Sequence, residues 1–377
     1  MADKYRFRLF DILKSYYQGI LKEDYFLDSA EQRLYRKIYF ETFRHLGFIE
    51  KALGTLYKTA PDADARAALA LGACQILFMN DIPEYAAVNE SVSLVDKSKR
   101  SFVNAVLRNL ARKKDELMAG YNIRKDFPDW FIDRWEKSLG SELDDFLNDL
   151  NKKPSFYSVS RDTMQISKVR DESDGYIMDY ASYSVARLAG DISPMSVLDC
   201  CAAPGGKTFV LSGTYPDARV FAVEKNKRRY EQLKENTAHL KNVDCVCADI
   251  LELDTEAEFD LVLLDAPCTA LGTIKRHPEV RWLRKQRDIK ECSKRQKEML
   301  DKAAGFTGKN STLIYSVCSL EPEETTEVIE NFLTNHDTFS IVSPQCDEIF
   351  INNDFFVSLP YKTDADGFFA CVLKNNR

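Results

Sequence analysis

Several patterns typical of membrane, secreted or metal-binding proteins are missing from this 377-residue sequence. No apolar run reaches the ~18 residues of a membrane-spanning helix. The first ten residues carry Asp3, Lys4, Arg6 and Arg8 in place of the apolar core of a signal peptide. Ten cysteines are present, but none are spaced as Cys-x-x-Cys, which argues against a zinc ribbon or a thioredoxin-like site. We therefore expect a cytoplasmic protein with reduced thiols, no metal and no membrane association.

Two common nucleotide-binding patterns are also incomplete. Gly206-Lys207-Thr208 resembles the end of a phosphate loop, but that motif requires a glycine at position 201, where the chain has Cys201. Nor does the sequence contain Gly-x-Gly-x-x-Gly. These gaps disfavour a nucleotide triphosphatase and a dinucleotide-dependent dehydrogenase.

Negative charge predominates overall, with a formal net charge of −7, yet one stretch is basic. Residues 275–298 carry ten Lys or Arg against four acids, an excess of six positive charges. Such a stretch on an acidic protein favours focused phosphate binding, with Lys275, Arg276, Arg281 and Arg284 as candidate RNA contacts. A solvated helix face with i,i+4 ion pairs is the alternative.

The first 125 residues contain only helical patterns. Apolar side chains recur at helical spacing within 34–53, 65–79 and 103–110. Pro61 and Pro83 mark turns between these segments. An all-α domain with its own core is predicted.

The middle of the chain, from 126 to 190, is less regular. A helix is expected to begin within 126–130 and to run toward Leu150. It is followed by one or two short strands within 156–169, a turn at 170–175 and a helix over 180–189. This part reads as a linker helix and a small subdomain.

Residues 191–377 alternate between short apolar strands and helices. The candidate strands are 197–200, 220–224, 244–247, 260–264 and 312–315, and the candidate helices are 207–214, 227–240, 289–306 and 323–335. This alternation predicts an α/β domain with a parallel, doubly wound sheet. Segments 339–342 and 368–373 suit a final antiparallel hairpin.

Ligands of such sheets bind at the carboxyl ends of the strands. The first strand is followed by Gly205 and Gly206, which allow close backbone approach at a helix N-terminus. The second strand ends at Glu224, suited to the two ribose hydroxyls of an adenosine group. Asp249 follows the third strand, where it can reach an adenine amine. The order of these signals predicts an adenosine-containing cofactor.

Cys268 and Cys318 lie in turns just after the fourth and fifth strands. If these strands are neighbours in a parallel sheet, their ends lie only ~4.8 Å apart. The two thiols would then flank one pocket, although 50 residues separate them. Covalent chemistry is predicted, with one thiol to attack and the other to help release.

Four motifs carry a resemblance to a known family. They are Cys-Ala-Ala-Pro-Gly-Gly-Lys-Thr at 201–208, Asp-Ala-Pro-Cys-Thr-Ala-Leu-Gly at 265–272, Arg-His-Pro-Glu-Val-Arg-Trp-Leu at 276–283 and Tyr-Ser-Val-Cys-Ser-Leu-Glu-Pro-Glu-Glu at 315–324. In this order they resemble Sun/Fmu-type (RsmB-like) RNA cytosine-C5 methyltransferases. Segments 82–90 and 104–109 resemble the NusB-like domain joined to the bacterial 16S ribosomal RNA members.

The resemblance implies a Rossmann-like, S-adenosylmethionine-dependent methyltransferase domain at 191–377, preceded by a NusB-like helical RNA-binding domain at 1–125. Residues 126–190 would hold a linker helix and a shortened RNA-binding subdomain. The implied substrate is a cytosine of 16S ribosomal RNA, single-stranded or flipped out of its stack. We expect a monomer. A transfer-RNA cytosine-C5 methyltransferase and an RNA-binding protein without methylation activity are the alternatives.

The resemblance also implies roles for single residues. Cys318 would be the nucleophile, Cys268 would assist release, and Asp265 would face the ring nitrogen and the exocyclic amine of cytosine. Lys207 would lower the pKa of the thiol or contact the base. Trp282, Phe209 and His277 are candidates for stacking on the base. The implied cofactor-binding residues are Cys201, Ala202, Ala203, Pro204, Gly205, Gly206, Lys207, Glu224, Arg229, Asp249 and Asp265.

Overall fold

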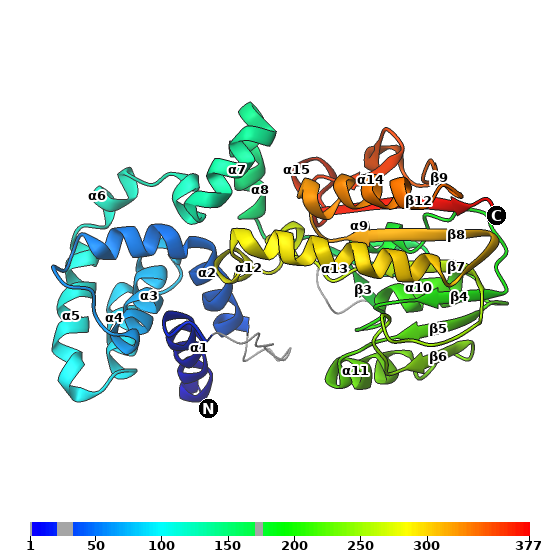
Figure 1. Ribbon diagram of the computed structural model, residues 1–377. Coiled ribbons are helices and arrows are strands. Elements are labelled where there is room, and N and C mark those ends of the chain that lie inside the picture. The colour runs from blue at the N-terminus through cyan, green and yellow to red at the C-terminus, as the bar shows by residue number, and fades with distance from the viewer. Residues whose placement is uncertain (1, 21–32, 170–175) are drawn as a thin grey trace. The chain divides into compact units, whose positions relative to one another are not determined.

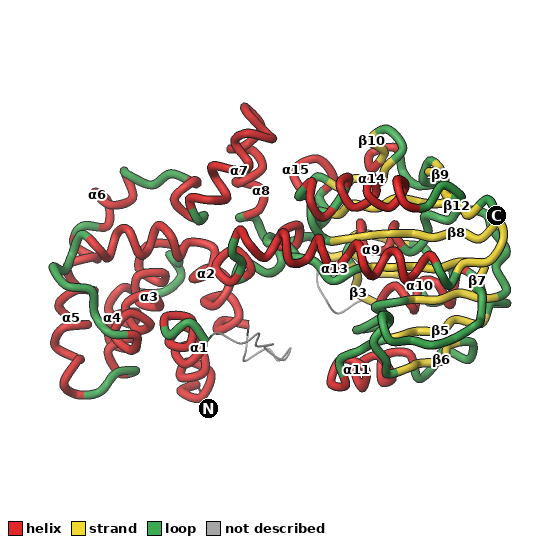
Figure 2. Tube along the Cα trace, viewed as in Figure 1, coloured by secondary structure: helices red, strands yellow, loops and turns green. Residues whose placement is uncertain are grey.

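The computed structural model describes residues 2–20, 33–169 and 176–377 (Figure 1). The turn expected at 170–175 lies outside the described residues. Among the residues described, no helix is both long and apolar enough to cross a membrane. All described strands follow residue 155, and the described residues before it form helices and loops (Figure 2).

Contacts divide the chain into two compact units. Unit 1 combines Met1–Asn151 with His277–Leu283, and unit 2 combines Lys152–Arg276 with Arg284–Arg377. The short segment 277–283 therefore belongs to unit 1, although in sequence it lies between the motifs at 265–272 and 315–324. The functional division at 125 and 190 stays a prediction.

Unit 1 is a helical bundle built around α3 (Ala63–Phe78). This helix packs against α1, α2, α4 and α5. Its small side chains, such as Ala67, Ala70 and Ala73, are fully buried, so that neighbouring helices approach it from several sides. The other helices are α1 (Ala2–Tyr17), α2 (Arg33–Gly54), α4 (Glu84–Ser93), α5 (Lys97–Arg112), α6 (Lys114–Ala119), α7 (Asp129–Leu139), α8 (Leu143–Leu150) and α12 (Val280–Leu283), with 3₁₀ turns η2 (Ile123–Asp126) and η3 (Gly140–Glu142).

The helical patterns at 34–53, 65–79 and 103–110 are confirmed as α2, α3 and α5. The single helix expected to run toward Leu150 is wrong. It breaks at Gly140, whose φ of 52° lies in the left-handed region that ends helices, so the chain forms α7 and α8 instead.

Unit 2 contains a large mixed sheet with the strand order β10-β11-β12-β8-β7-β4-β5-β6. Strands β4 to β8 pair in parallel, and β12 pairs antiparallel with β8, β9 and β11. The bounds are β4 (Ser196–Asp199), β5 (Arg219–Val223), β6 (Val243–Val246), β7 (Phe259–Asp265), β8 (Thr307–Val317), β9 (Phe339–Val342), β10 (Ile351–Asn352), β11 (Phe355–Ser358) and β12 (Phe368–Asn375). The predicted doubly wound α/β fold is confirmed.

Each face of this sheet has its own core. Along β7, Leu261 and Leu263 belong to one core, whereas Val262 and Leu264 belong to the other, as the period of two in a strand requires. The first core includes side chains of α9 (Tyr180–Val185) and α10 (Gly206–Thr214), and the second includes those of α13 (Gln286–Ala304) and α14 (Thr326–Asn335). The helix α11 (Lys227–Thr237) buries Leu233 beside Ala222. Burial on both faces explains why the centre of the sheet consists of short apolar runs, such as Leu261–Leu264 in β7.

The remaining elements refine the expectations for the middle and the tail. The short strands expected within 156–169 are confirmed as β1 (Phe156–Val159) and β2 (Ile166–Val169), which form a small sheet with β3 (Tyr176–Met178). In the tail, the antiparallel pairing of 339–342 with β12 is confirmed, but no simple hairpin forms. The strands β10 and β11 intervene in sequence, and β11 also pairs with β12.

Candidate active site

The turn after β4 forms the cradle at the expected cofactor position. Gly205 has a φ of 111°, and a Cβ atom there would meet Leu233 and Thr237 at 3.2 Å. Only glycine adopts this conformation without strain. Two side chains hold the turn: Arg229 Nη2 donates to the carbonyl of Ala203, and Asn236 Nδ2 donates to that of Pro204 at 2.8 Å. The helix α10 begins directly afterwards at Gly206.

Two acids stand at the ends of the next strands. Glu224 follows β5, is 5% exposed, and accepts a hydrogen bond from the Asn226 amide at 2.7 Å. Arg229 Nη1 lies 3.7 Å from the Glu224 carboxylate. Asp249 follows β6 and pairs with Lys225 and, at 3.6 Å, with Arg295. Although partial burial opposes it, pairing with Lys225 lowers the pKa of Asp249.

Lys207 and Asp265 form an ion pair between α10 and the end of β7. Lys207 Nζ lies 2.7 Å from Asp265 Oδ2 and also donates to Ser182 Oγ at 2.9 Å. The other oxygen, Asp265 Oδ1, accepts from Ser316 Oγ at 2.7 Å. Burial lowers the pKa of Lys207, but the Asp265 carboxylate outweighs it, so the pKa lies above its ordinary value. The ammonium is therefore charged, and the nearby Cys318 sulfur adds to this effect.

Cys268 and Cys318 are in contact. Their strands β7 and β8 are parallel neighbours, with Asp265 paired to Ser316, so the turns that follow both strands meet. The two Sγ atoms lie 2.9 Å apart, and both side chains are partly exposed. The hydrogen bond to Cys318 and burial raise the pKa of Cys268 well above its ordinary value. The prediction that the two strand ends bring both thiols to one place is confirmed.

Sequence reasoning missed three polar side chains of this site. Ser182 and Ser316 bind the Lys207–Asp265 pair, and Glu324 was noticed only as part of a motif. The position of Ser316, two residues before Cys318, was the available signal for one of them. Ser182 comes from α9 and carries no local pattern that points to the site.

The basic stretch at 275–298 is not one exposed patch, which corrects the expectation for its first residues. Lys275 is 2% exposed and lies 3.5 Å from Asp364. Arg276 binds Asp179 and Asp366, each at 3.0 Å. These two cations belong to the packing of unit 2. The exposed basic side chains lie at the start of α13 and along it: Lys285, Arg287, Lys290, Lys294 and Arg295.

Arg281 also differs from its expected role. It is fully buried in unit 1, where its guanidinium stacks 4.0 Å from the centre of the Phe127 ring. Its Nη1 donates to Asn151 Oδ1 at 2.8 Å and to the carbonyls of Arg44 and Asp126. Burial lowers the pKa of Arg281 to about 9. A side chain in this environment does not reach a phosphate.

The three stacking candidates have different surroundings. Phe209 is 3% exposed and stacks on Tyr176, so it is part of the core of unit 2. Trp282 donates its indole N–H to the carbonyl of Phe43 and packs on the core of unit 1. His277 is half-exposed and lies 3.4 Å from Glu279. Phe209 and Trp282 are therefore packing residues, and stacking of His277 on the base stays a prediction.

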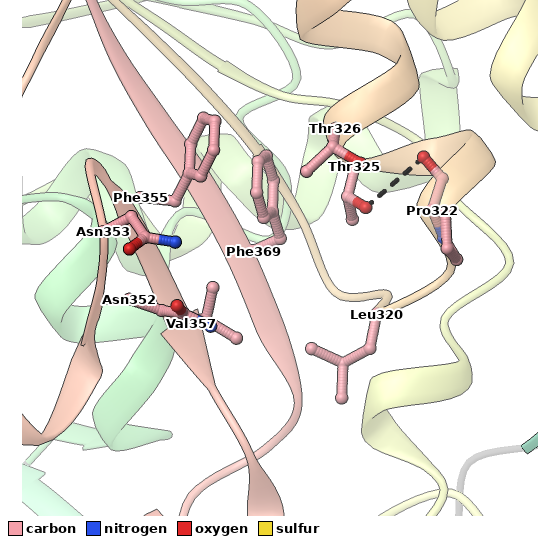
Figure 3. Close-up of a pocket in the computed structure, with 9 residues that line it drawn as sticks. All are labelled: Leu320, Pro322, Thr325, Thr326, Asn352, Asn353, Phe355, Val357 and Phe369. Atoms are coloured by element: carbon pink, nitrogen blue, oxygen red, sulfur yellow. Dashed lines mark hydrogen bonds between the residues drawn. The ribbon is translucent and has the colours of Figure 1, made fainter. Parts of the chain in front are cut away.

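A cavity of about 290 Å³ lies beside the Cys318 turn (Figure 3). Figure 3 shows the rings of Phe355 and Phe369 on one side and Leu320 and Pro322 on the other. The remaining lining residues are Thr325, Thr326, Asn352, Asn353 and Val357. No residue predicted for the cofactor or the chemistry lines this cavity, so it is distinct from the cradle after β4.

Known proteins with similar sequences span most of the chain. A ribosomal RNA small subunit methyltransferase B from Cronobacter sakazakii is 28% identical over 92% of this chain and 91% of that protein. The protein of the same name from Photorhabdus laumondii is 27% identical over 81% of each. Among solved structures, PH0851 superposes with a TM-score of 0.76 over 98% of each chain at 23% identity, which shows a shared fold.

Two families account for most of the sequence. Residues 191–374 match the family described as 16S rRNA methyltransferase RsmB/F, and residues 8–112 match the NusB family. The cofactor is S-adenosylmethionine, and the site fits it: the Gly205 turn leaves room for backbone approach, and Glu224 and Asp249 offer carboxylates at successive strand ends. Through residues 191–374 the chain therefore belongs to the RsmB/F family of 16S rRNA methyltransferases, and it carries a NusB-family domain at residues 8–112.

Proposed function

We propose that the protein methylates C5 of a cytosine in 16S ribosomal RNA through a covalent bond between Cys318 and C6 of the base. The observation that carries this proposal is the pair of thiols 2.9 Å apart beside the Lys207–Asp265 ion pair. Methylation of a ring nitrogen or a ribose hydroxyl needs no thiol pair, whereas attack on C6 and later release need two reactive groups.

The first steps follow from the groups present. The Cys318 thiolate adds to C6 while nitrogen 3 takes a proton from the Lys207–Asp265 pair, to which that proton returns on release. The addition makes the ring an enamine, so that C5 becomes nucleophilic. Asp265 and Lys207 hold that proton and the exocyclic amine in place. S-adenosylmethionine, when bound, supplies the electrophilic methyl group. The base must leave its stack to enter such a site.

Release requires a base for the proton on C5. The hydrogen bond to Cys318 is the largest cause of the raised pKa of Cys268. Once Cys318 is bonded to C6, that bond and the nearby charge are gone, so Cys268 loses its proton to solvent more readily. Its thiolate then takes the proton from C5, the C6–sulfur bond breaks, and the C5–C6 double bond re-forms. The proposed roles of the two thiols are thus unequal.

The test combines transfer with mapping. The full-length protein is incubated with S-adenosylmethionine carrying a labelled methyl group and with 16S ribosomal RNA, and the product is mapped by bisulfite sequencing. We expect label at a single unconverted cytosine. A parallel reaction contains transfer RNA in place of 16S ribosomal RNA, and label there alone would make transfer RNA the substrate. RNA binding without transfer would support a binding protein that has lost methylation activity.

A further inference from the structure

A fully buried carboxylate, Glu324, lies next to the thiol pair and has no part in the chemistry proposed above. It ends the 3₁₀ turn η5 (Pro322–Glu324) and is 0% exposed. A buried carboxylate is stable only where hydrogen bonds or counter-charges replace its hydration. Its partners therefore indicate why this position carries an acid.

The Glu324 carboxylate binds both cysteine turns. Oε1 accepts from the backbone amide of Thr269 at 2.9 Å, and Oε2 accepts from the Thr269 hydroxyl. On the other side, the hydroxyl of Ser319 donates to Oε2 at 2.6 Å. Thr269 directly follows Cys268, and Ser319 directly follows Cys318. One carboxylate thus joins the residues that come after each thiol.

Two further contacts fix the position of Glu324. Gln296 on α13 donates to Glu324 Oε1 and to the carbonyl of Pro267, both at 3.0 Å. The buried Tyr315 hydroxyl donates to the Glu324 carbonyl at 2.7 Å. The carboxylate therefore cannot move away from the thiols without breaking several buried hydrogen bonds.

The Glu324 carboxylate accepts hydrogen bonds from uncharged groups of Thr269, Ser319 and Gln296. Its negative charge is therefore spread over hydrogen bonds, and one cation, Arg284, donates from Nε to the Thr269 carbonyl of the same turn at 2.7 Å. The carboxylate binds the turns of both thiols, and its charge adds to the rise in the Cys268 pKa, whose larger causes are the hydrogen bond to Cys318 and burial. Cys318 instead has the Lys207 ammonium in its surroundings.

We propose that Glu324 is a positioning residue that clasps the Cys268 and Cys318 turns together and keeps the shared proton of the thiol pair on Cys268, so that Cys318 is the thiol that attacks. The hydrogen bonds of Glu324 hold the two sulfurs in contact, and its charge favours the proton on Cys268. This inference rests on the proposed function for the meaning of attack and release, but its test needs no RNA.

Thiol alkylation measures the asymmetry directly. The full-length protein is treated with iodoacetamide from pH 6 to pH 10, and the rates at Cys318 and Cys268 are read by peptide mass spectrometry. We expect Cys318 to react at least about tenfold faster near pH 8, because the raised pKa of Cys268 keeps that thiol protonated there. Glu324→Gln keeps the size and removes the charge, so the preference for Cys318 should shrink by about two- to threefold, because the hydrogen bond to Cys318 and burial still raise the pKa of Cys268.

Further variants separate the charge from the clasp. Glu324→Asp keeps the charge but is one methylene shorter, so it should keep the alkylation preference and lose methyl transfer by at least about tenfold. Glu330→Gln removes an exposed carboxylate from the neighbouring helix α14 and should change neither quantity. If Glu324→Gln does not fold, Thr269→Val with Ser319→Ala removes two donors and should lower methyl transfer while Cys318 stays the faster thiol.

The outcomes distinguish the inference from the proposed function. A folded Glu324→Gln variant with an unchanged preference for Cys318 would overturn the inference, as would faster alkylation of Cys268 in the unaltered protein. Unchanged methyl transfer in both Glu324→Asp and the double variant would show that methyl transfer does not depend on Glu324 holding the two turns together. If the unaltered protein transfers no methyl group to RNA, the proposed function fails, and the alkylation result still decides the role of Glu324.

Discussion

At the scale of single residues, Cys318 and Cys268 differ only in their neighbours. Cys318 has Lys207 nearby, whereas Cys268 has the negative charge of Glu324. Cys318→Ala should abolish methylation and every covalent RNA adduct, because no nucleophile remains. Cys268→Ala should accumulate an adduct that survives denaturation, because the C5 proton is not removed. A denaturing gel of enzyme incubated with RNA and cofactor reports both.

Cys292→Ala is the matched control for these two variants. Cys292 is also a partly exposed cysteine, but it lies on α13. The Cys292→Ala variant should methylate RNA normally and leave no covalent RNA adduct on the gel. An adduct in Cys318→Ala, together with its absence in Cys268→Ala, would reverse the two roles.

At the scale of elements, the Cys318 turn depends on a close backbone crossing. The Gly272 amide donates to the carbonyl of Cys318 at 3.0 Å, and the Gly367 amide donates to the carbonyl of Gly272 at 2.8 Å. A Cβ atom at Gly272 would lie 1.9 Å from the Gly367 oxygen. Gly272→Ala should therefore lower stability by about 1–3 kcal/mol and displace the Cys318 turn.

Denaturant unfolding and methyl transfer together measure this effect. Gly54→Ala serves as the control, because a Cβ atom at Gly54 would meet nothing within 4 Å. It should alter neither stability nor transfer by much. Full transfer and stability in Gly272→Ala would mean that the crossing has room to relax.

A second prediction at this scale concerns α2, which is joined to η2 by a histidine. His45 Nδ1 lies 2.8 Å from Asp126 Oδ2, and its ring stacks on Phe78. Burial lowers the pKa of His45, but Asp126 and Glu41 outweigh it, so the folded pKa lies above 6.5. The stabilisation is present below pH 6.5 and is lost as the pH rises through the folded pKa.

Hydrogen exchange of α2 peptides should therefore be faster at pH 8.5 than at pH 5.5, after correction for the intrinsic pH dependence of amide exchange. His45→Gln should remove most of this difference. His336→Gln, which changes a histidine of unit 2 paired with Asp301, should leave the α2 peptides unaffected. Equal protection at both pH values would show that His45 does not couple to α2.

At the scale of the whole molecule, the notable feature is the assignment of residues 277–283 to unit 1. Arg281 is buried there among carbonyls and the Phe127 ring. Arg281→Ala should lower the free energy of unfolding by about 2–4 kcal/mol, because it leaves a cavity and unpaired carbonyls. Denaturant unfolding measures the loss.

Arg287→Ala is the control for Arg281, because Arg287 is 72% exposed. The free energy of unfolding of the Arg287→Ala variant should differ from that of the unaltered protein by less than about 0.5 kcal/mol. A stable Arg281→Ala variant with weaker RNA binding and a smaller salt dependence would instead restore Arg281 as a phosphate contact.

The sequence by itself determined the elements and the chemistry of the loops. Periodicity reveals α2 and α5, because burial of one face leaves a local record in the order of residues. Short apolar runs reveal the strands of the sheet, which is covered on both faces. Glycine at 205 and the cysteines at 268 and 318 are likewise visible, since each belongs to a short motif at a strand end.

Only the tertiary structure decided which side chains meet. Glu324 binds Thr269 across 55 residues of sequence, and Arg281 reaches Asn151 across 130. Charge composition placed Arg281 among the RNA contacts, but burial turned it into a packing residue. Pairing and burial depend on strand register and on which elements become neighbours, and no local pattern records them. The thiols and their expected roles were readable from the motifs, but the contact between the two sulfurs and the different charges around them follow from the neighbours that the fold supplies.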